Sequence, residues 1–172
     1  MKPRTVLIAL LMIPLLWPSC RQRTEEDNVL QTVDSLVRLA EKKDLESIMG
    51  YFAEDFADFD GRDKNGLRSL LSSYLNGRTG IVVHRLNNRI IELNAGRAAL
   101  ETDVALSSGG AEALRRLARI SPDIYRLRID LAKVGEKWLI GYAEWSSIGL
   151  TELLPESLRE LKKIFPKTEI DR

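Results

Sequence analysis

The sequence predicts an α+β domain in which an antiparallel sheet packs on helices that precede it in the chain. Two observations predict this class. Apolar residues recur at helical spacing between residues 25 and 75, whereas they alternate at strand spacing in most of residues 81–147. Because the helical and the extended segments are grouped rather than interleaved, the pattern favours an α+β class over repeated βαβ units.

The length and charge of the chain fit a single globular domain that does not bind nucleic acid. The chain has 172 residues, and 44% of them are hydrophobic, which is typical of a folded domain. Two of its 26 basic residues, Lys2 and Arg4, lie in the leader described next, so the rest of the chain is nearly neutral. Because phosphate binding needs a basic stripe, this balance argues against a nucleic-acid partner.

Residues 1–19 have the three parts of a secretory signal peptide. Lys2 and Arg4 make a basic start, and residues 5–17 are apolar after the first of them. That apolar run is shorter than the roughly 20 residues that a membrane-spanning helix needs. A proline and a small residue, Ser19, follow it. We therefore expect residues 1–19 to be removed during export.

Cys20 is the only cysteine of the chain, so it cannot form an internal disulfide. The run Leu-Leu-Trp-Pro-Ser-Cys over residues 15–20 resembles the lipobox of bacterial lipoproteins, in which a small residue precedes the acylated cysteine. The resemblance implies cleavage before Cys20 and a lipid anchor of two or more acyl chains, which holds stably where a single chain does not. By the same resemblance, Arg21 in place of the Asp that often marks inner-membrane retention favours the periplasmic face of the outer membrane, in an organism that has one. A simple secreted protein and an uncleaved anchor are the alternatives.

Three helices are expected in the first half of the exported chain. The first covers residues 25–43, with apolar residues at i, i+4, i+7, i+8 and i+11 and an approximate capping box at its start. Asp44 caps a second, short helix that carries Phe52 at the end of its apolar face. A loop rich in Asp and Gly is expected over residues 56–65, and a third amphipathic helix over residues 66–75.

Two hairpins are expected in the second half. Their strands are predicted over residues 81–93, 97–106, 123–133 and 137–147. The sequence Asn94-Ala95-Gly96 predicts a tight turn within the first hairpin. A helix over residues 111–120 is expected between the hairpins, and a last helix over residues 155–164 begins with a proline, which suits a first helical turn.

This order of elements and two short motifs resemble the nuclear transport factor 2-like superfamily, which includes ketosteroid isomerase, scytalone dehydratase and the polyketide cyclases. Residues 36–56 follow the family's pattern of a helix, an Asp-Leu pair, a second helix and Phe-Ala-x-Asp. Residues 135–140, Gly-Glu-Lys-Trp-Leu-Ile, look like its last hairpin. The resemblance implies a strongly curved antiparallel sheet wrapped around the helices as a cone with an open mouth. An unrelated α+β sandwich is the alternative.

These features divide the chain into four parts. We expect a lipoprotein signal peptide over residues 1–19 and a lipidated cysteine with its tether over residues 20–28. A nuclear transport factor 2-like domain is expected over residues 29–148, and a C-terminal helical tail over residues 149–172.

The resemblance also implies candidate catalytic residues in the cone. In the isomerase branch an Asp after the second helix acts as general base, and this position falls on Asp60. The family's tyrosine position falls on Leu36, which cannot donate a hydrogen bond to an oxyanion. His84, the only histidine, could line the cone as an acid–base group near neutral pH. Asp60 with His84 is therefore the best catalytic pair, and an ordinary turn aspartate and a packing histidine are the alternatives.

Aromatic residues of the last expected strand are candidate ligand-binding residues. Alternation predicts Trp138 and Tyr142 on one face of that strand and Trp145 on the other. Trp138 and Tyr142 could line a hydrophobic pocket for a small apolar ligand or a partner protein. Packing of these rings in the core is the alternative.

No metal site and no cofactor are predicted. Asp55, Asp58, Asp60 and Asp63 lie close together in the sequence, but their spacing fails the test for an EF-hand. If Gly61 took the sixth position of such a loop, Phe and Leu would stand at the first and twelfth positions, where oxygen ligands are required. A single histidine and a lipidated cysteine also leave too few ligands for a transition-metal site. We interpret the acidic run as a solvated loop.

The sequence favours a membrane-anchored lipoprotein of the cell envelope that acts as a non-catalytic module for a small ligand or a partner protein. The mismatch at Leu36 and the expected lipid on Cys20 support this function. Two alternatives stay open: an isomerase-, dehydratase- or cyclase-like enzyme that uses Asp60 and His84, and an envelope assembly or scaffold factor. The candidate partners are the membrane, a small apolar ligand, an envelope protein and a second copy of the chain.

Overall fold

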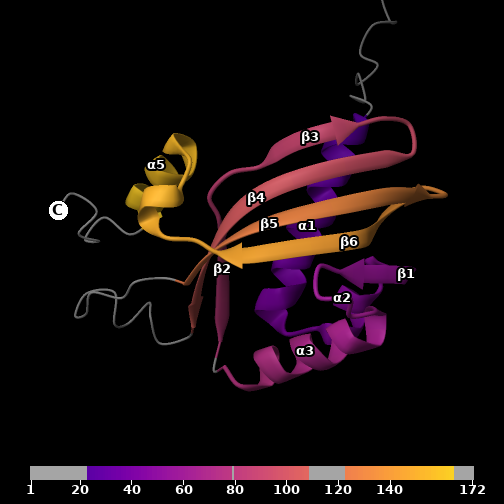
Figure 1. Cartoon of the computed structure of the whole chain (residues 1–172), viewed down its shortest axis with the longest axis horizontal. Coiled ribbons are helices and arrows are strands. Elements are labelled where there is room, and N and C mark those ends of the chain that lie inside the picture. Colours follow the sequence, from indigo (N-terminus) through magenta and orange to yellow (C-terminus); the bar gives the residue numbers. More distant parts are fainter. Residues whose placement is uncertain (1–22, 79, 109–122, 165–172) are drawn as a thin grey trace, which may run out of the picture.

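The computed structural model describes residues 23–78, 80–108 and 123–164. Its elements in chain order are α1 (Glu25–Lys42), α2 (Leu45–Met49), β1 (Phe52–Asp58), α3 (Lys64–Asn76), β2 (Ile81–Arg85), β3 (Arg89–Leu93), β4 (Arg97–Ser108), β5 (Asp123–Val134), β6 (Lys137–Ser147), η1 (Leu150–Glu152) and α5 (Pro155–Ile164). Figure 1 shows a curved sheet with α5 at one end of its strands, separate from α1, α2 and α3. This arrangement confirms the predicted α+β class.

The sheet has the strand order β1-β6-β5-β4-β2, and β3 also pairs with β4. β4, β5 and β6 are long neighbours in antiparallel register, so both predicted hairpins are present. β2 and β3 pair with successive halves of β4. β1 lies at the opposite edge and runs parallel to β6, which makes the otherwise antiparallel sheet mixed at that edge.

Polar caps in the sequence set the helix boundaries. The Thr24 hydroxyl accepts a hydrogen bond from the Asp27 N–H at 3.1 Å, and the Asp27 carboxylate accepts one from the Thr24 N–H at 3.0 Å, which completes a capping box. α1 ends where Lys43 adopts a left-handed conformation with a φ of 58°. Asp44 and Asp63 cap α2 and α3 by accepting from N–H groups three residues further on. Because these caps are local, the sequence predicted the ends of the long helices to within about two residues.

The main hydrophobic core lies between the helices and one face of the sheet, which we call the inner face. Leu100 of β4 and Ile129 of β5 point to this face, and Val29 of α1 is completely buried against it. The buried members of this core are Val29, Val33, Ile48, Met49, Phe52, Phe56, Leu67, Leu75, Ile81, Ala98, Leu100, Ile129, Leu131, Trp138 and Ile140. Burial of this apolar surface is the main force that holds the helices to the sheet.

A second, smaller cluster lies under α5 on the other face of the sheet, which we call the outer face. Leu161 of α5 is completely buried there against Ala105 of β4 and Ile124 of β5. These two strand residues alternate with Leu100 and Ile129 along the same strands, so they point away from the main core. The predicted helix over residues 155–164 is therefore present, and it covers part of the outer face.

β1 corrects the prediction of a loop over residues 56–65. Phe52 does not belong to α2 but is the first residue of this strand, and Phe56 and Asp58 are its other buried residues. The strand was missed because Glu54 and Asp55 interrupt its apolar alternation. An edge strand tolerates such residues, since one of its edges and one of its faces can reach solvent.

The segment predicted as one strand over residues 81–93 is divided into β2 and β3. Asn87 lies at the division, where its side-chain oxygen accepts a hydrogen bond from the Asp103 N–H at 2.7 Å. The Thr102 hydroxyl also donates to the Asn87 carbonyl at 2.6 Å. The Asn87 side chain thus takes the place of a backbone carbonyl as the hydrogen-bond partner of Asp103 in β4. Regular pairing with β4 therefore stops after β2 and resumes in β3.

Several predicted features lie outside the described residues: the signal peptide over residues 1–19, the lipidation site at Cys20 and the helix over residues 111–120. α1 already includes residues 25–28, so the tether predicted over residues 20–28 reaches no further than Thr24. Within the described ranges, no helix combines the length and the apolar character needed to cross a bilayer.

Candidate functional site

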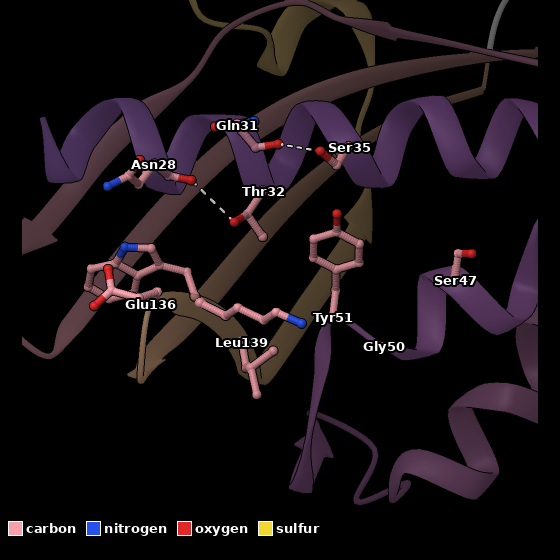
Figure 2. Close-up of a pocket in the computed structure, with 11 residues that line it drawn as sticks. Asn28, Gln31, Thr32, Ser35, Ser47, Gly50, Tyr51, Glu136 and Leu139 are labelled. Carbon is pink, nitrogen blue, oxygen red and sulfur yellow. Dashed lines mark hydrogen bonds between the residues drawn. The ribbon is translucent and has the colours of Figure 1, made fainter. Parts of the chain in front are cut away.

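An open groove of about 390 Å³ lies where the first half of α1 faces the α2–β1 corner and the β5–β6 turn (Figure 2). Its volume is within the range of small-molecule sites. Most of its lining side chains are polar and uncharged. The lining residues are Asn28, Gln31, Thr32, Ser35, Ser47, Gly50, Tyr51, Glu136, Lys137, Trp138 and Leu139.

One wall of the groove is a stripe of uncharged polar residues on α1. Asn28, Gln31, Thr32 and Ser35 stand at i, i+3, i+4 and i+7, so they share one side of the helix. The Thr32 hydroxyl donates to the Asn28 carbonyl at 3.2 Å, and the Ser35 hydroxyl donates to the Gln31 carbonyl at 2.8 Å (Figure 2). Since each hydroxyl donates its proton to the helix backbone, only its oxygen lone pairs are left for other partners, and the Ser35 oxygen already accepts from Arg38 at 2.9 Å.

Tyr51 and the β5–β6 turn form the facing wall. Tyr51 follows Gly50, the last cap residue of α2, and its carbonyl accepts a hydrogen bond from the Ile140 N–H at 2.8 Å, which fixes its backbone against β6. Figure 2 shows the phenol of Tyr51 directed toward α1. Glu136 and Lys137 place one negative and one positive group at the same rim. The groove thus offers donors, acceptors, one aromatic ring and both signs of charge.

Trp138 lies at the base of the groove but serves mainly to join α1 to the sheet. Only 3% of its surface is exposed, and its indole N–H donates to Glu25 at 3.0 Å. Lys133 donates to the other oxygen of Glu25 at 2.5 Å. The hydrogen bond from Lys133, followed by that from Trp138, holds the pKa of Glu25 below its ordinary value. Glu25, Lys133 and Trp138 therefore clamp the start of α1 to the β5–β6 hairpin.

Tyr142 does not share a face with Trp138, which corrects the predicted alternation. Leu131 pairs with Ile140, but Asp130 pairs with Tyr142, so Gly141 is an extra residue in β6. Such a β-bulge shifts every later side chain to the other face. As a result, Trp145 packs against the main core with Trp138, and Tyr142 turns to the outer face. The structure does not bring Trp138 and Tyr142 into one pocket.

Asp60 lies in the turn between β1 and α3 and makes local contacts. Its N–H donates to the buried carboxylate of Asp58 at 3.0 Å, and its own carboxylate, which is 49% exposed, pairs with Arg62 at 2.6 Å. Arg62 also donates to Asp58 at 2.7 Å, and this bond is the first cause of a raised pKa of Arg62. These contacts are those of a turn-stabilising ion network.

His84 lies on β2, at the other edge of the sheet from β1. Ile81 and Val83 of the same strand pack in the main core, and His84 pairs with Ala105, which belongs to the outer-face cluster. Alternation therefore directs His84 to the outer face and not into the cone. With β6, β5 and β4 between β1 and β2, the structure does not bring His84 together with Asp60.

The described residues contain no group of three or more His, Cys, Asp or Glu side chains arranged to hold a metal ion. Three of the four aspartates near residue 60 have other tasks instead: Asp58 organises the turn, Asp60 pairs with Arg62, and Asp63 caps α3.

No protein-family model and no curated protein matches this sequence. Solved structures do match its fold. A candidate scytalone dehydratase from Novosphingobium aromaticivorans has a TM-score of 0.60 at 14% identity, over 73% of this chain and 85% of its own. A nuclear transport factor 2-like protein of unknown function from Pseudomonas putida has a TM-score of 0.60 at 15% identity, over 71% of this chain and 85% of its own. Bd1075 from Bdellovibrio bacteriovorus has a TM-score of 0.59 at 19% identity, over 73% of this chain but only 42% of its own.

The fold is nuclear transport factor 2-like. At these identities the likeness concerns the fold alone, and it confirms the fold class that the order of elements predicted. In this nuclear transport factor 2-like fold, the main core packs between the helices and the inner face and includes Phe52, Phe56 and Trp138. The groove lies at the margin of that core, beside the start of α1, and Trp138 belongs to both.

Tyr51 and the polar stripe of α1 were not among the site residues predicted from the sequence. The stripe nevertheless has a sequence signal, because Asn28, Gln31, Thr32 and Ser35 repeat uncharged hydrogen-bonding residues at helical spacing. A fully solvated helix face in a chain with 30% charged residues is expected to carry more charge than this. The position of Tyr51 opposite the stripe has no such signal, since it depends on how α2 meets β1.

Proposed function

We propose that this chain is a lipid-anchored, non-catalytic module of the bacterial cell envelope that binds a polar small molecule in the groove between α1 and Tyr51. The observation that carries the proposal is the uncharged polar stripe of α1, which faces an open groove with Tyr51 and Lys137 on the opposite wall.

The chemistry of the lining indicates the class of ligand. Several acceptors and amide groups stand along two turns of α1, and Tyr51 adds one aromatic surface. Such a set favours a ligand with several hydroxyl or amide groups and one apolar face, such as a sugar or a short peptide. This class replaces the small apolar ligand that the pair Trp138 and Tyr142 predicted.

The test is native mass spectrometry of the protein purified from its own bacterial membranes, which detects a retained ligand by its mass. Tyr51→Phe and Gln31→Ala are expected to lose the ligand or weaken its binding at least tenfold. Tyr142→Phe removes a tyrosine hydroxyl from the outer face and is the matched control. If the Tyr51→Phe and Gln31→Ala variants both retain the ligand, the groove is overturned as the binding site. If the protein instead converts its ligand to a product and Asp60→Asn abolishes that conversion, the enzyme alternative is supported.

The lipid anchor rests on Cys20 and the lipobox-like residues before it. Its position supports the proposal, because α1 begins only a few residues later and leaves no room for another domain between anchor and fold. Labelled palmitate is expected to enter the wild-type chain and not the Cys20→Ala variant. Membrane attachment of that variant at wild-type levels would overturn the anchor.

A second candidate function, recognition of an envelope protein, is favoured by a surface cluster of Phe59, Arg62 and Trp145. The Phe59 and Trp145 rings meet edge to face at 4.8 Å, and Arg62 lies 5.4 Å from the Trp145 ring centroid. Phe59 is 44% exposed. Aromatic and arginine side chains are enriched at binding hot spots. Phe59→Ser is expected to abolish a cross-link to such a partner and to leave ligand retention in the groove unchanged.

A further inference from the structure

We infer that one end of the domain, which we call the anchor pole, lies within the headgroup region of the bilayer. The anchor pole consists of the first turn of α1, the β3–β4 turn at residues 94–96 and the β5–β6 turn at residues 135–136, with their flanking residues. This inference rests on the proposed lipid at Cys20, and it adds an orientation and a second set of membrane contacts.

The covalent reach of the anchor restricts which surface meets the membrane. Glu25 is five positions after Cys20 in the chain, so their Cα atoms are at most about 18 Å apart. β4 has 12 residues and is about 40 Å long, so the end of the sheet away from the anchor pole lies well beyond that reach. The start of α1 is therefore the part of the fold held closest to the lipid.

The two turns are fixed beside the start of α1. Glu25 binds Lys133 and Trp138 across the β5–β6 hairpin, as described above. The Lys133 N–H also donates to the Gly96 carbonyl at 2.9 Å, which joins the β5–β6 hairpin to the β3–β4 turn. Because these contacts link three elements, the anchor pole is a preformed surface.

Exposed apolar side chains gather at this pole. Val134 is 57% exposed and Leu93 37%, and each adjoins one of the two turns, while Ile91, which is 48% exposed, lies two residues before Leu93 on β3. The other large apolar residues that are this exposed among the described ones, Phe59 and Leu70, belong to the region of β1 and α3. Figure 1 shows α3 on the other side of the domain from the beginning of α1. Apolar side chains at a tethered end would gain stability by leaving water for the acyl boundary.

The charges of the anchor pole are mixed and do not favour an anionic surface. Arg97 and Lys137 are exposed there, but so are Glu92, Glu136 and Asp27. The apolar residues, and not electrostatic attraction, are therefore expected to set the contact, which should depend little on the fraction of anionic lipid. The ligand groove shares Glu136 and Lys137 with this pole, so it would open next to the headgroups.

The absence of any second cysteine permits a direct test of this orientation. The mature lipoprotein carrying Val134→Cys is labelled with a fluorophore and reconstituted in phosphatidylcholine vesicles that contain brominated acyl chains. The matched control is Leu70→Cys, which places the same probe on an exposed apolar position of α3. Quenching at position 134 is expected to exceed that at position 70 at least threefold. Equal quenching at the two positions of the vesicle-bound protein would overturn the inference and leave the lipid anchor intact.

A second arm distinguishes failure of the orientation from failure of the anchor. The chain from Cys20 onward, which retains every described residue, is coupled through the Cys20 thiol to a maleimide lipid in vesicles. Hydrogen exchange of residues 93–97 and 134–137 is expected to slow at least threefold, with no change in α3. Val134→Asp with Leu93→Asp is expected to remove this protection. If the native protein carries no lipid but the coupled chain shows slowed hydrogen exchange at the two turns, the proposed anchor fails and the membrane-binding surface stands. If hydrogen exchange at the two turns of the coupled chain is not slowed, the inference is overturned.

Discussion

The two faces of the sheet are held to their helices by different interactions. On the inner face, α1, α2 and α3 pack on apolar side chains such as Leu100 and Ile140. On the outer face, α5 also packs on apolar residues around Leu161, but that cluster is small and surrounds a buried carboxylate, Asp103. The inner face depends on the area of apolar surface removed from water, whereas the outer face depends on matched polar groups.

Asp103 is fully buried and satisfied from several elements. Arg126, its cross-strand neighbour on β5, donates to its two oxygens at 2.8 and 3.3 Å. The Ser157 hydroxyl of α5 donates at 2.7 Å, and the Asn87 amide lies 3.4 Å away. The hydrogen bond to Asp103 is the first cause of a raised pKa of Arg126. Arg126 also donates to the Glu152 carbonyl at 3.0 Å, so the network ties both the break after β2 and the C-terminal segment to the sheet.

This difference teaches how each face tolerates change. An apolar contact loses stability in proportion to the volume removed, while a buried polar network loses it when a single partner is left unsatisfied. Substitutions on the two faces should therefore differ in how much they lower the free energy of unfolding. They should also differ in which part of the fold they destabilise.

The largest loss is expected on the inner face. Leu100→Ala removes a completely buried side chain from the main core and leaves a cavity, so we expect the free energy of unfolding to fall by about 3–5 kcal/mol. Urea denaturation measures this change. Val134→Ala, at an exposed position, is the control and should change stability by less than about 0.5 kcal/mol. A loss below about 1 kcal/mol for Leu100→Ala would contradict the assignment of the main core.

The next largest loss is expected at Asp103. Asp103→Ala leaves Arg126 without its carboxylate, and we expect unfolding free energy to fall by about 2–3 kcal/mol. Replacing both partners, in Asp103→Leu with Arg126→Met, should recover much of that stability because no unpaired charge remains. Denaturation of the single and double variants checks this prediction. Equal destabilisation of both would show that shape, and not charge pairing, dominates the outer face.

A smaller and more local effect is expected at Ser157. Ser157→Ala removes one donor to Asp103 but keeps Arg126, so we expect a loss of about 1 kcal/mol. Because Ser157 belongs to α5, hydrogen exchange should accelerate in α5 by roughly fivefold and stay unchanged in α1. Uniform acceleration in both helices would mean that α5 does not open separately from the main core.

The smallest effect is expected at Glu25 and depends on pH. Lys133 and Trp138 hold the pKa of Glu25 below its ordinary value of 4.5, so the ionised carboxylate stabilises the folded state. This contribution is fully present above about pH 4.5 and is lost as the pH falls through the lower, folded-state pKa. The stability difference between wild type and Glu25→Gln should therefore be largest at neutral pH and shrink in acid. Glu26→Gln, which removes an exposed carboxylate from the same helical turn, is the control.

The sequence by itself determined the features that short stretches of chain decide. The capping box at Thr24, the turn at residues 94–96 and the helix at Pro155 all depend on residues within a few positions of one another. The order of these elements, together with the motif over residues 36–56, was enough to predict the nuclear transport factor 2-like fold.

Only the tertiary structure decided the features that depend on distant partners. β1 exists because β6 offers it a parallel edge, and the bulge at Gly141 reverses the faces of Tyr142 and Trp145 through a register set by β5. The polar stripe of α1 could be read from the sequence, but its wall at Tyr51 could not. These features depend on contacts between strands and loops that are far apart in the sequence. Residue types at a fixed local spacing do not specify which distant segments pair.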